Sequence, residues 1–477
     1  MKRFLCFVIT FILILGMCAC GGEKANPNAL QAGFARVDCL PDDSKVHIAG
    51  GDAASDVSAG VLDMIAVTCI ALKQGEQTYL IYTCDVVDIE KFYIDTEVAI
   101  ATATEVPSTH ILLNATHTHS APTLKDNLPG KDAYLAKFNA ACADAGVKAI
   151  EDLSPATLSY GSVQTQNMVR VRHYLMKDGT SYGGGHGSTT GTEIQEHHYP
   201  SDEECQVLRL TRPAEDKKDI VLMNLGAHAT IVSATHTDLL SPDFPGPARD
   251  YVEENADVHC AYFIAAAGDQ TPSSKIPGEI PNGRDHVAYG QQLGAYVVDC
   301  LGNMTDATGS EIKLYTETYT AQRMKEGTED QDRLKQAQEI VALKNQYKSY
   351  NTPQVKAKIT EYGFSSYYEA SGLVTRANAT ETGTFDIHAM TIGDVGLVFF
   401  PGEMFSTQGT TLKTDSPMAM TFVVTCSEGD QGYFPNEIAC EHSYYEYDIT
   451  KFARGTGEDV VNRYIEIFKA LQAGETP

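Results

Sequence analysis

The sequence predicts an α/β fold in which mixed β-sheets are flanked by helices and belong to one large domain. Apolar, β-branched runs of strand length recur along the chain, and amphipathic stretches of helical spacing lie between them. Several apolar runs end in histidine, aspartate or glutamate, which is where an α/β protein presents its site residues. With 477 residues, 43% of them hydrophobic, the chain is long enough to bury a large core.

Strands and helices alternate through the first two thirds of the chain. The β-rich runs at 61–72 and 78–89 are separated by a short polar segment with Gly75, which predicts a close antiparallel pair. The segment 132–153 has apolar residues at helical spacing and is predicted to be an amphipathic helix. Further strands are expected at 33–41, 111–113, 156–163, 169–174, 205–212, 220–227 and 261–267, and further helices at 90–105, 245–255 and 285–301.

The last third begins with a charged segment, 329–347, that is predicted to be a solvated helix with a partial apolar stripe. A loop-rich continuation is expected at 350–369. Residues 385–400 are expected to form a hairpin whose turn is Gly393-Asp394. A strand at 418–426 and a closing helix at 458–471 complete the predicted fold.

The N-terminus is typical of a bacterial lipoprotein. Lys2 and Arg3 precede an apolar run, and Ala19-Cys20-Gly21-Gly22 follows it. Residues 1–20 are therefore expected to be the signal peptide with its lipobox, 21–30 a flexible tether and 31–477 the folded domain. Cys20 is the expected lipidated residue, with Cys18 as the alternative. A single membrane span is the other interpretation, although the run is short for one.

Composition narrows the possible partners. The chain has 63 acidic and 36 basic residues and a formal net charge of −27, which argues against a nucleic-acid partner. The lipid on Cys20 would then hold an exported protein at the bacterial cell surface. The remaining cysteines are scattered, odd in number and mostly in apolar contexts, so we expect buried free thiols. They are Cys39, Cys69, Cys84, Cys142, Cys205, Cys260, Cys300, Cys426 and Cys440.

The strongest chemical signal is the segment Asn114-Ala-Thr-His-Thr-His-Ser-Ala-Pro122, which follows an apolar run. In an extended strand His117 and His119 would point to the same side. Two imidazoles aimed at one point suit a metal ion, or a metal ligand beside a proton carrier. The alternative is a pair of histidines at a strand end whose nitrogens bind backbone groups.

Two further strand ends carry possible ligands, His228 and Glu403. Together with His117 they would make two histidines and a carboxylate, a common donor set of open zinc sites. Taken one at a time, His228 is better explained as a core imidazole and Glu403 as an exposed loop carboxylate.

The order of these motifs resembles the catalytic domain of the neutral/alkaline ceramidases, from about Ala32 onwards. The motifs are Asn114 to Pro122, Asn224-Leu-Gly-Ala-His228, Ser241-Pro-Asp-Phe-Pro-Gly246, Gly268-Asp-Gln-Thr-Pro272 and Pro401-Gly-Glu403. The resemblance implies a zinc amidohydrolase. It implies that Zn²⁺ is held by His117, His228, Glu403 and Tyr433.

The resemblance also implies roles for residues around the metal. His119 matches a histidine that does not bind zinc and would carry a proton to the leaving amine. Tyr445 matches a tyrosine that contacts the reacting carbonyl. Arg172 matches a site arginine, but Val171 stands where the family usually has asparagine, so Arg170 is a rival.

One site residue departs from the family pattern. The family's serine in Gly-Asp-x-Ser-Pro is Thr271 here. The extra methyl would crowd a nucleophile, so Thr271 is expected to position substrate, with a role as a weak nucleophile as the alternative. The chain also ends at Pro477, and we expect no C-terminal immunoglobulin-like domain.

The implied reaction is hydrolysis of the N-acyl amide of ceramide, or of a related N-acyl lipid, to fatty acid and amine by a zinc-activated water. Two alternatives stay open. One is a zinc hydrolase of another N-acylated or esterified compound, for example an acylated amino sugar. The other is a non-enzymatic lipoprotein that binds a metal or a solute. The expected partners are a small-molecule or lipid amide and the membrane under the lipid anchor.

Overall fold

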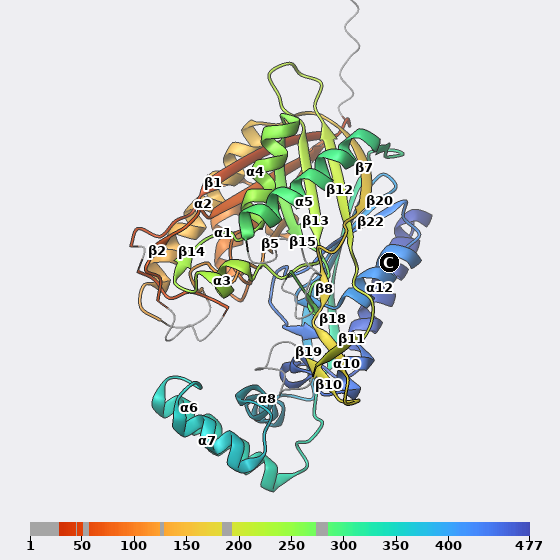
Figure 1. Ribbon diagram of the computed structural model, residues 1–477. Helices are drawn as coiled ribbons and strands as arrows, with labels where there is room; N and C mark the ends of the chain where they lie inside the picture. Colours follow the sequence, from red (N-terminus) through yellow and green to blue (C-terminus); the bar gives the residue numbers. More distant parts are fainter. Residues whose placement is uncertain (1–27, 44, 51–56, 125–127, 184–192, 273–284) are drawn as a thin grey trace, which may run out of the picture.

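The computed structural model describes residues 28–43, 45–50, 57–124, 128–183, 193–272 and 285–477 (Figure 1). The predicted signal peptide, Cys18, Cys20 and most of the predicted tether lie outside these residues. Among the helices of the described residues, none is long and apolar enough to cross a membrane. The nine cysteines from Cys39 to Cys440 are free thiols and buried, as the sequence predicts.

The first of three large sheets has the strand order β5-β4-β3-β1-β6. Its strands are β1 (Gln31–Asp38), β3 (Ala66–Gln74), β4 (Gln77–Cys84), β5 (Ile111–Ala115) and β6 (Ser154–Pro155). β3 and β4 form the expected antiparallel pair, whereas β4 and β5 are parallel and joined through helix α1 (Tyr93–Thr104). Helix α2 (Lys131–Glu151) packs on α1 and on this sheet, because its apolar side faces β1 and β3.

The second large sheet has the order β15-β13-β12-β7-β17. Its strands are β7 (Thr157–Gln164), β12 (Glu204–Thr211), β13 (Ile220–Leu225), β15 (His259–Ile264) and β17 (Thr305–Asp306). β13 and β15 are parallel, and helix α4 (Pro245–Ala256) connects them. Helices α4 and α5 (His286–Cys300) pack on each other and on this sheet (Figure 1).

The third large sheet has the order β18-β19-β20-β22. Its strands are β18 (Ile312–Gln322), β19 (Thr382–Ile392), β20 (Val395–Phe399) and β22 (Met420–Val424), and the sequence analysis did not anticipate β18. Helices α9 (Ser406–Asp415) and α12 (Thr456–Ala473) cover one of its faces. The inner faces of all three sheets share one apolar cluster, which includes Ile81, Phe263 and Leu397.

The helical insertion α6–α8 differs from its prediction. Residues 350–369 are not loop-rich, since they contain helix α7 (Pro353–Tyr362) and the start of α8 (Tyr367–Asn378). Helix α7 has proline at its first position and Gly363 after its end, and Val355 is buried against its neighbours. The sequence analysis missed this helix because it is short and its few apolar residues lie in a polar segment. The insertion lies at one end of the molecule, and α6 (Gln331–Tyr347) packs on α8 (Figure 1).

The remaining elements are short and lie mostly around the ends of the large sheets. They are β2 (Gly60–Val61), η1 (Ser108–His110), β8 (Arg170–Val171), β9 (His173–Met176), β10 (Ser181–Gly183), β11 (Ile194–His197), α3 (Ile231–Thr235), β14 (Leu239–Leu240), β16 (Gln270–Thr271), η2 (Leu301–Asn303), β21 (Glu403–Met404), β23 (Tyr433–Phe434), α10 (Glu437–Glu441) and α11 (Tyr445–Ile449).

The architecture confirms the predicted mixed α/β class. Each large sheet contains one parallel pair, β4–β5, β13–β15 or β20–β22. The carboxyl ends of these strands meet, as short bridges between Asn114 and Ser427 and between Thr118 and Ala229 show. Ligands of α/β proteins bind beyond the carboxyl ends of parallel strands. The fold therefore places the residues that follow β5, β13 and β20 at one point.

Candidate metal centre

His117 follows β5 but does not continue it. The strand ends at Ala115, and the Thr116 N–H then bonds to the Cys84 carbonyl, which turns the chain away from the sheet edge. His117 itself has φ of +61°, in the left-handed region. The prediction that His117 and His119 lie on one extended strand is thus wrong. Their imidazoles still converge, with 3.2 Å between the two Nε2 atoms.

His228 follows β13 in the same way. Its Nδ1 donates to the Ala267 carbonyl at 2.7 Å, with the Gln270 carbonyl at 3.0 Å. The Gln270 side chain in turn bonds to the Gly226 carbonyl at 2.6 Å, so the segment after β15 holds the segment after β13. The imidazole of His228 is therefore held in one orientation and one tautomer.

Glu403 completes the group from the third sheet. It lies at the start of β21, beyond β20, where its N–H bonds to the Gly432 carbonyl at 2.9 Å. Its Oε2 lies 3.0 Å from His228 Nε2 and 3.3 Å from His117 Nε2. All three side chains are buried. The structure thus brings together the two histidines and the carboxylate that the sequence analysis selected.

The donor atoms of this group are placed so that they could bind a cation between them. His117 Nδ1 donates to the Val87 carbonyl at 2.7 Å and His228 Nδ1 to the Ala267 carbonyl, so each ring presents Nε2 to the centre and, when neutral, offers a lone pair there. Glu403 Oε2 is buried and has no hydrogen-bond partner. These three lone pairs fit a metal ion, and in its absence only a proton can take that place.

The electrostatics describe the group without an ion, where His117 holds a proton in the ion's place. Although burial lowers it, the neighbouring Cys426 and Glu403 raise the pKa of His117 well above its usual value. Burial raises the pKa of Glu403, but His117 and His228 outweigh it and hold that pKa well below the usual range. The carboxylate is therefore ionised and available as a ligand.

His119 lies beside the three donors. Its Nδ1 lies 3.2 Å from the Gly50 carbonyl, and its Nε2 faces His117. Gly50 has φ of +93°, and a Cβ there would lie 2.4 Å from His119 Nδ1, so this position requires glycine. Burial, reinforced by His117 and His228, lowers the pKa of His119 to about 3. The buried group His117, His119 and His228 is able to bind a metal, with His119 either as a further ligand or beside it.

Arg172, rather than Arg170, reaches the centre. Its guanidinium bonds to the Tyr433 hydroxyl at 3.3 Å, and that hydroxyl lies 3.5 Å from His228 Nε2. Arg170 instead pairs with Glu203 at 2.7 Å. Tyr433 is thus adjacent to the donors and available as a fourth ligand.

A carboxylate that the sequence analysis missed holds Arg172. Glu446 is fully buried and accepts from Arg172 Nε at 2.7 Å, and it lies 2.9 Å from His173 Nε2. Burial raises the pKa of Glu446, but Arg172 and His173 outweigh it and bring that pKa to about 2. The only signal was its position next to Tyr445.

Tyr445 and Thr271 lie at the edge of the centre. The Tyr445 ring lies 5.7 Å from the Tyr433 ring, edge to face, and 5.1 Å from the Tyr368 ring of the α6–α8 insertion. Thr271 is buried on β16, next to Gln270, whose carbonyl contacts His228. In the antiparallel pair of β16 and β8, Thr271 lies opposite Arg170. All eight predicted site residues of the folded domain therefore lie at or next to the centre.

Two buried asparagines, also missed as site residues, connect the three sheets. Asn114 accepts from the Ser427 hydroxyl at 2.6 Å, which ties β5 to the segment after β22. Asn224 donates to the Val423 carbonyl at 2.8 Å, which ties β13 to β22. Each asparagine lies three or four residues before a histidine of the group, Asn114 before His117 and Asn224 before His228. Their amides fix the relative position of the strand ends.

A second group of ionisable side chains, here called the carboxyl cluster, lies beside β5, with Glu428 and His388 buried and Glu97 and Asp386 half-buried. It consists of Glu97, Asp386, His388 and Glu428. Glu428 Oε1 accepts from the Leu113 N–H at 2.5 Å, and Oε2 lies 3.6 Å from His388 Nε2. Burial and the neighbouring Glu97 raise the pKa of Glu428 well above its usual value, while burial and Asp386 raise that of Glu97 to about 7.

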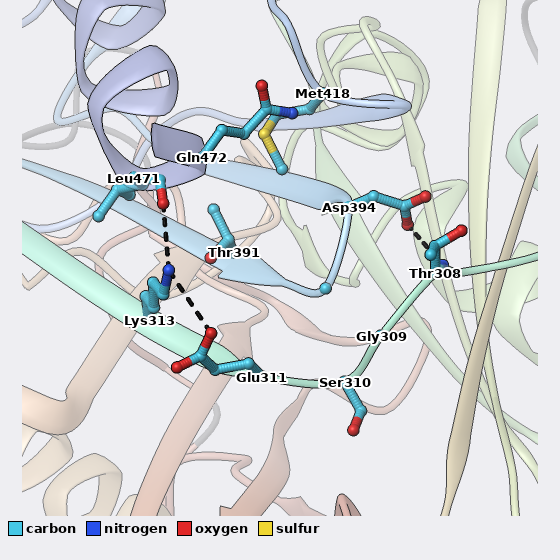
Figure 2. Close-up of a pocket in the computed structure, with 11 residues that line it drawn as sticks. Thr308, Gly309, Ser310, Glu311, Lys313, Thr391, Asp394, Met418, Leu471 and Gln472 are labelled. Atoms are coloured by element: carbon cyan, nitrogen blue, oxygen red, sulfur yellow. Dashed lines mark hydrogen bonds and ion pairs between the residues drawn. The ribbon is translucent and has the colours of Figure 1, made fainter. Parts of the chain in front are cut away.

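A cavity at the β19–β20 turn is separate from the metal centre. Its volume is about 310 Å³, and Figure 2 shows Lys313 between the Glu311 carboxylate and the Leu471 carbonyl. Asp394 accepts from the Thr308 N–H at 2.8 Å. None of the site residues lines this cavity, and these polar groups already have partners.

The fold is similar to that of solved ceramidases. A crystal structure of neutral ceramidase from Pseudomonas aeruginosa matches with a TM-score of 0.69 at 15% sequence identity, over 94% of this chain and 75% of that chain. A ceramidase complexed with C2 matches with the same TM-score and identity, over 94% of this chain and 76% of that chain. No family model and no curated protein matches the sequence. At this identity the likeness establishes the fold, and the chemistry rests on the centre itself.

Proposed function

We propose that this chain is a zinc-dependent amide hydrolase that cleaves the N-acyl amide of ceramide or a related N-acyl lipid. The observation that carries the proposal is the convergence of His117 Nε2 and His228 Nε2 on Glu403 Oε2, with no hydrogen-bond donor between them. The likeness of the fold to neutral ceramidase supports an amide as the substrate.

The donor set favours zinc. Two histidines and a carboxylate leave a position open for substrate or water, and in such sites zinc activates a water and polarises a carbonyl. Tyr433 would be the fourth ligand, since its hydroxyl lies 3.5 Å from His228 Nε2.

The chain's own residues would supply the remaining chemistry. His119 presents Nε2 toward the donors and would pass a proton from the attacking water to the leaving amine. Arg172 is held by Glu446 and by the Gly268 carbonyl at 2.8 Å, so its charge is fixed near the place where the oxyanion develops. Tyr445 would donate to the same oxygen, and Thr271 would orient the substrate.

The proposed lipid on Cys20 would place this centre close to membrane lipids. Replacing Cys20 with serine should move the protein from the membrane fraction to the soluble fraction while activity is unchanged. If the Cys18→Ser change releases the protein from the membrane fraction instead, Cys18 is the lipidated residue.

The test of the function is a substrate panel for the purified, zinc-loaded protein. It includes ceramides of different acyl length, N-acyl amino acids, N-acetylated amino sugars and matching esters. We expect release of fatty acid from the ceramides or another N-acyl lipid, and loss of that release in the His119→Ala protein. If only amino sugars are turned over, the substrate is an N-acetylated amino sugar and not an N-acyl lipid. No turnover of any compound would contradict the proposal.

A further inference from the structure

We propose that a cationic groove at the end of helix α8 binds a phosphate-class oxyanion. The groove has a volume of about 500 Å³ and lies where α8 ends beside Arg323 and the segment Thr450–Lys451. Arg323, Arg376 and Lys451 line it, together with the amide of Asn378. Among the residues that the structure describes, no carboxylate lines it. This inference is independent of the metal centre, whose donors lie elsewhere.

The three cations of the groove lie together in a strongly acidic protein. The chain carries a net charge of −27, and its carboxylates far outnumber its cations. Yet none of Arg323, Arg376 and Lys451 forms an ion pair with a carboxylate of the described residues, whereas Arg172, Arg249 and Arg463 do. Three unpaired cations that face one cavity create a local positive potential, which attracts anions.

Arg323 offers the most accessible donors. Its guanidinium lies 4.3 Å from the centre of the Phe452 ring, and no side-chain hydrogen bond of Arg323 is formed with the described residues. A Cβ at Gly383 would lie 2.2 Å from Arg323 Cζ, so the guanidinium lies flat across the glycine. The group is thus held between a ring and a backbone with its N–H edge unused. A planar guanidinium fork matches two oxygens of a phosphate.

Arg376 lies deeper in the groove and is held in place. It is 8% exposed, and its Nη2 donates to the carbonyls of Tyr447 and Asp448, while its Nε is buried without a partner. The neighbouring Asp448 offsets its charge only partly. Burial and Glu369 raise the pKa of Asp448 to about 7, although Arg376 itself lowers it.

The negative end of helix α8 does not oppose an anion here. Lys325 Nζ bonds to the carbonyls of Arg376 and Ala379, the former at 3.3 Å, and so caps the last turn. Lys451 uses one N–H on the Asp430 carbonyl at 2.9 Å and keeps the others. Asn378 forms no side-chain hydrogen bond with the described residues and adds a neutral donor.

The groove is larger than a single oxyanion, and pockets of this volume hold small organic ligands. Val374 and Ala379 supply apolar surface beside the cations. A phosphomonoester on a small apolar or amphipathic body fits this combination, and free phosphate presents the same headgroup. The source is therefore a soluble phosphate compound or the headgroup of a phosphomonoester lipid, and the two are separable by experiment.

The test is calorimetric titration of the full chain with inorganic phosphate, against sodium chloride of equal ionic strength. We expect saturable binding to the wild type, weakened about tenfold or more in Arg323→Gln and less in Arg323→Lys, which keeps the charge. Lys469→Gln, which removes an exposed charge from α12, is the matched control and should bind as the wild type does. His228→Ala should also retain binding, because it alters only the metal centre.

Equal binding by the wild type and Arg323→Gln, or loss of binding in His228→Ala alone, would overturn the proposal and assign the phosphate to another place. Phosphatidylcholine vesicles with and without phosphatidic acid then separate the two sources. Arg323-dependent binding to the phosphatidic acid vesicles identifies a lipid headgroup, and Arg323-dependent binding of inorganic phosphate alone identifies a soluble ligand. Binding of neither would contradict the assignment.

Discussion

The metal centre and the carboxyl cluster both bury several polar side chains that converge, yet their charges are neutralised in different ways. In the metal centre, backbone carbonyls take the Nδ1 protons of His117 and His228, so the lone pairs at Nε2 face Glu403. In the carboxyl cluster, Glu97 and Glu428 face each other, and both have raised pKa values. The first arrangement suits a cation, and the second holds protons on carboxyl groups.

The difference teaches how to distinguish a ligand set from a buried acid pair. Fixed tautomers and a depressed carboxylate pKa indicate groups arranged to bind a positive ion. Raised carboxyl pKa values indicate groups that stay neutral by holding protons. Burial alone, which both regions share, does not separate them.

The largest effect should come from removing a ligand. His117→Ala, His228→Ala and Glu403→Ala should each lose bound zinc, measured by elemental analysis, together with nearly all activity, because each removes one of three convergent donors. Glu428→Gln, from the carboxyl cluster, is the control and should keep zinc. Zinc retained by all three ligand variants would show that this group, like the carboxyl cluster, is not a set of zinc ligands.

The next effect concerns His119. His119→Ala should keep zinc and lose about 10²–10⁴-fold in kcat, the usual contribution of a positioned proton carrier. Loss of zinc equal to that of His228→Ala would instead make His119 a fourth ligand. Elemental analysis and steady-state kinetics on the same preparation separate the two roles.

A smaller effect is expected at Thr271. If water attacks, Thr271→Ser should retain activity and Thr271→Ala should lose about tenfold or less, the value of one hydrogen bond. If the hydroxyl is the nucleophile, the alanine variant should be inactive. Mass spectrometry of protein quenched during turnover decides, since an acyl adduct on Thr271 would contradict attack by water.

The smallest effect should be found in the carboxyl cluster. Because the pKa of Glu97 is raised to about 7 in the folded state, its contribution to stability is present at acid pH and is lost as the pH rises toward 7. Glu97→Gln should therefore raise the melting temperature relative to wild type at pH 8 and change it little at pH 4. Glu76→Gln, at an exposed turn, should show no such pH dependence.

The periodicity of the sequence predicted most of the fold, because long buried strands and amphipathic helices leave clear patterns. It missed β18, whose exposed residues interrupt its apolar side, and α7, which buries only Val355 within the helix. The site was found through residue types at strand ends. The contacts that orient it were not predictable, since Glu446, Asn114 and Asn224 act through long-range hydrogen bonds that only the assembled sheets create.

His117 shows the same limit at one residue. A strand pattern predicts that His117 and His119 share a side, and they do converge, but through a left-handed residue after the strand has ended. Local spacing reports which residues are close. It does not report the backbone conformation that brings them there, because bonds to Cys84 at the end of β4 and to Val87 in the loop after it help to determine it.

The nine buried thiols allow local or global unfolding of this protein to be measured at each cysteine. Burial keeps these nine thiols from solvent and raises the pKa of Cys39 to about 12 and of Cys426 to about 11, so these two present almost no thiolate to an alkylating reagent while the protein is folded. Each alkylation then requires a local or global opening, and its rate reports the free energy of that opening. Because Cys426 lies 3.5 Å from His117 Nδ1, any slowing of its alkylation by added zinc would measure the free energy by which a bound ion stabilises this part of the fold.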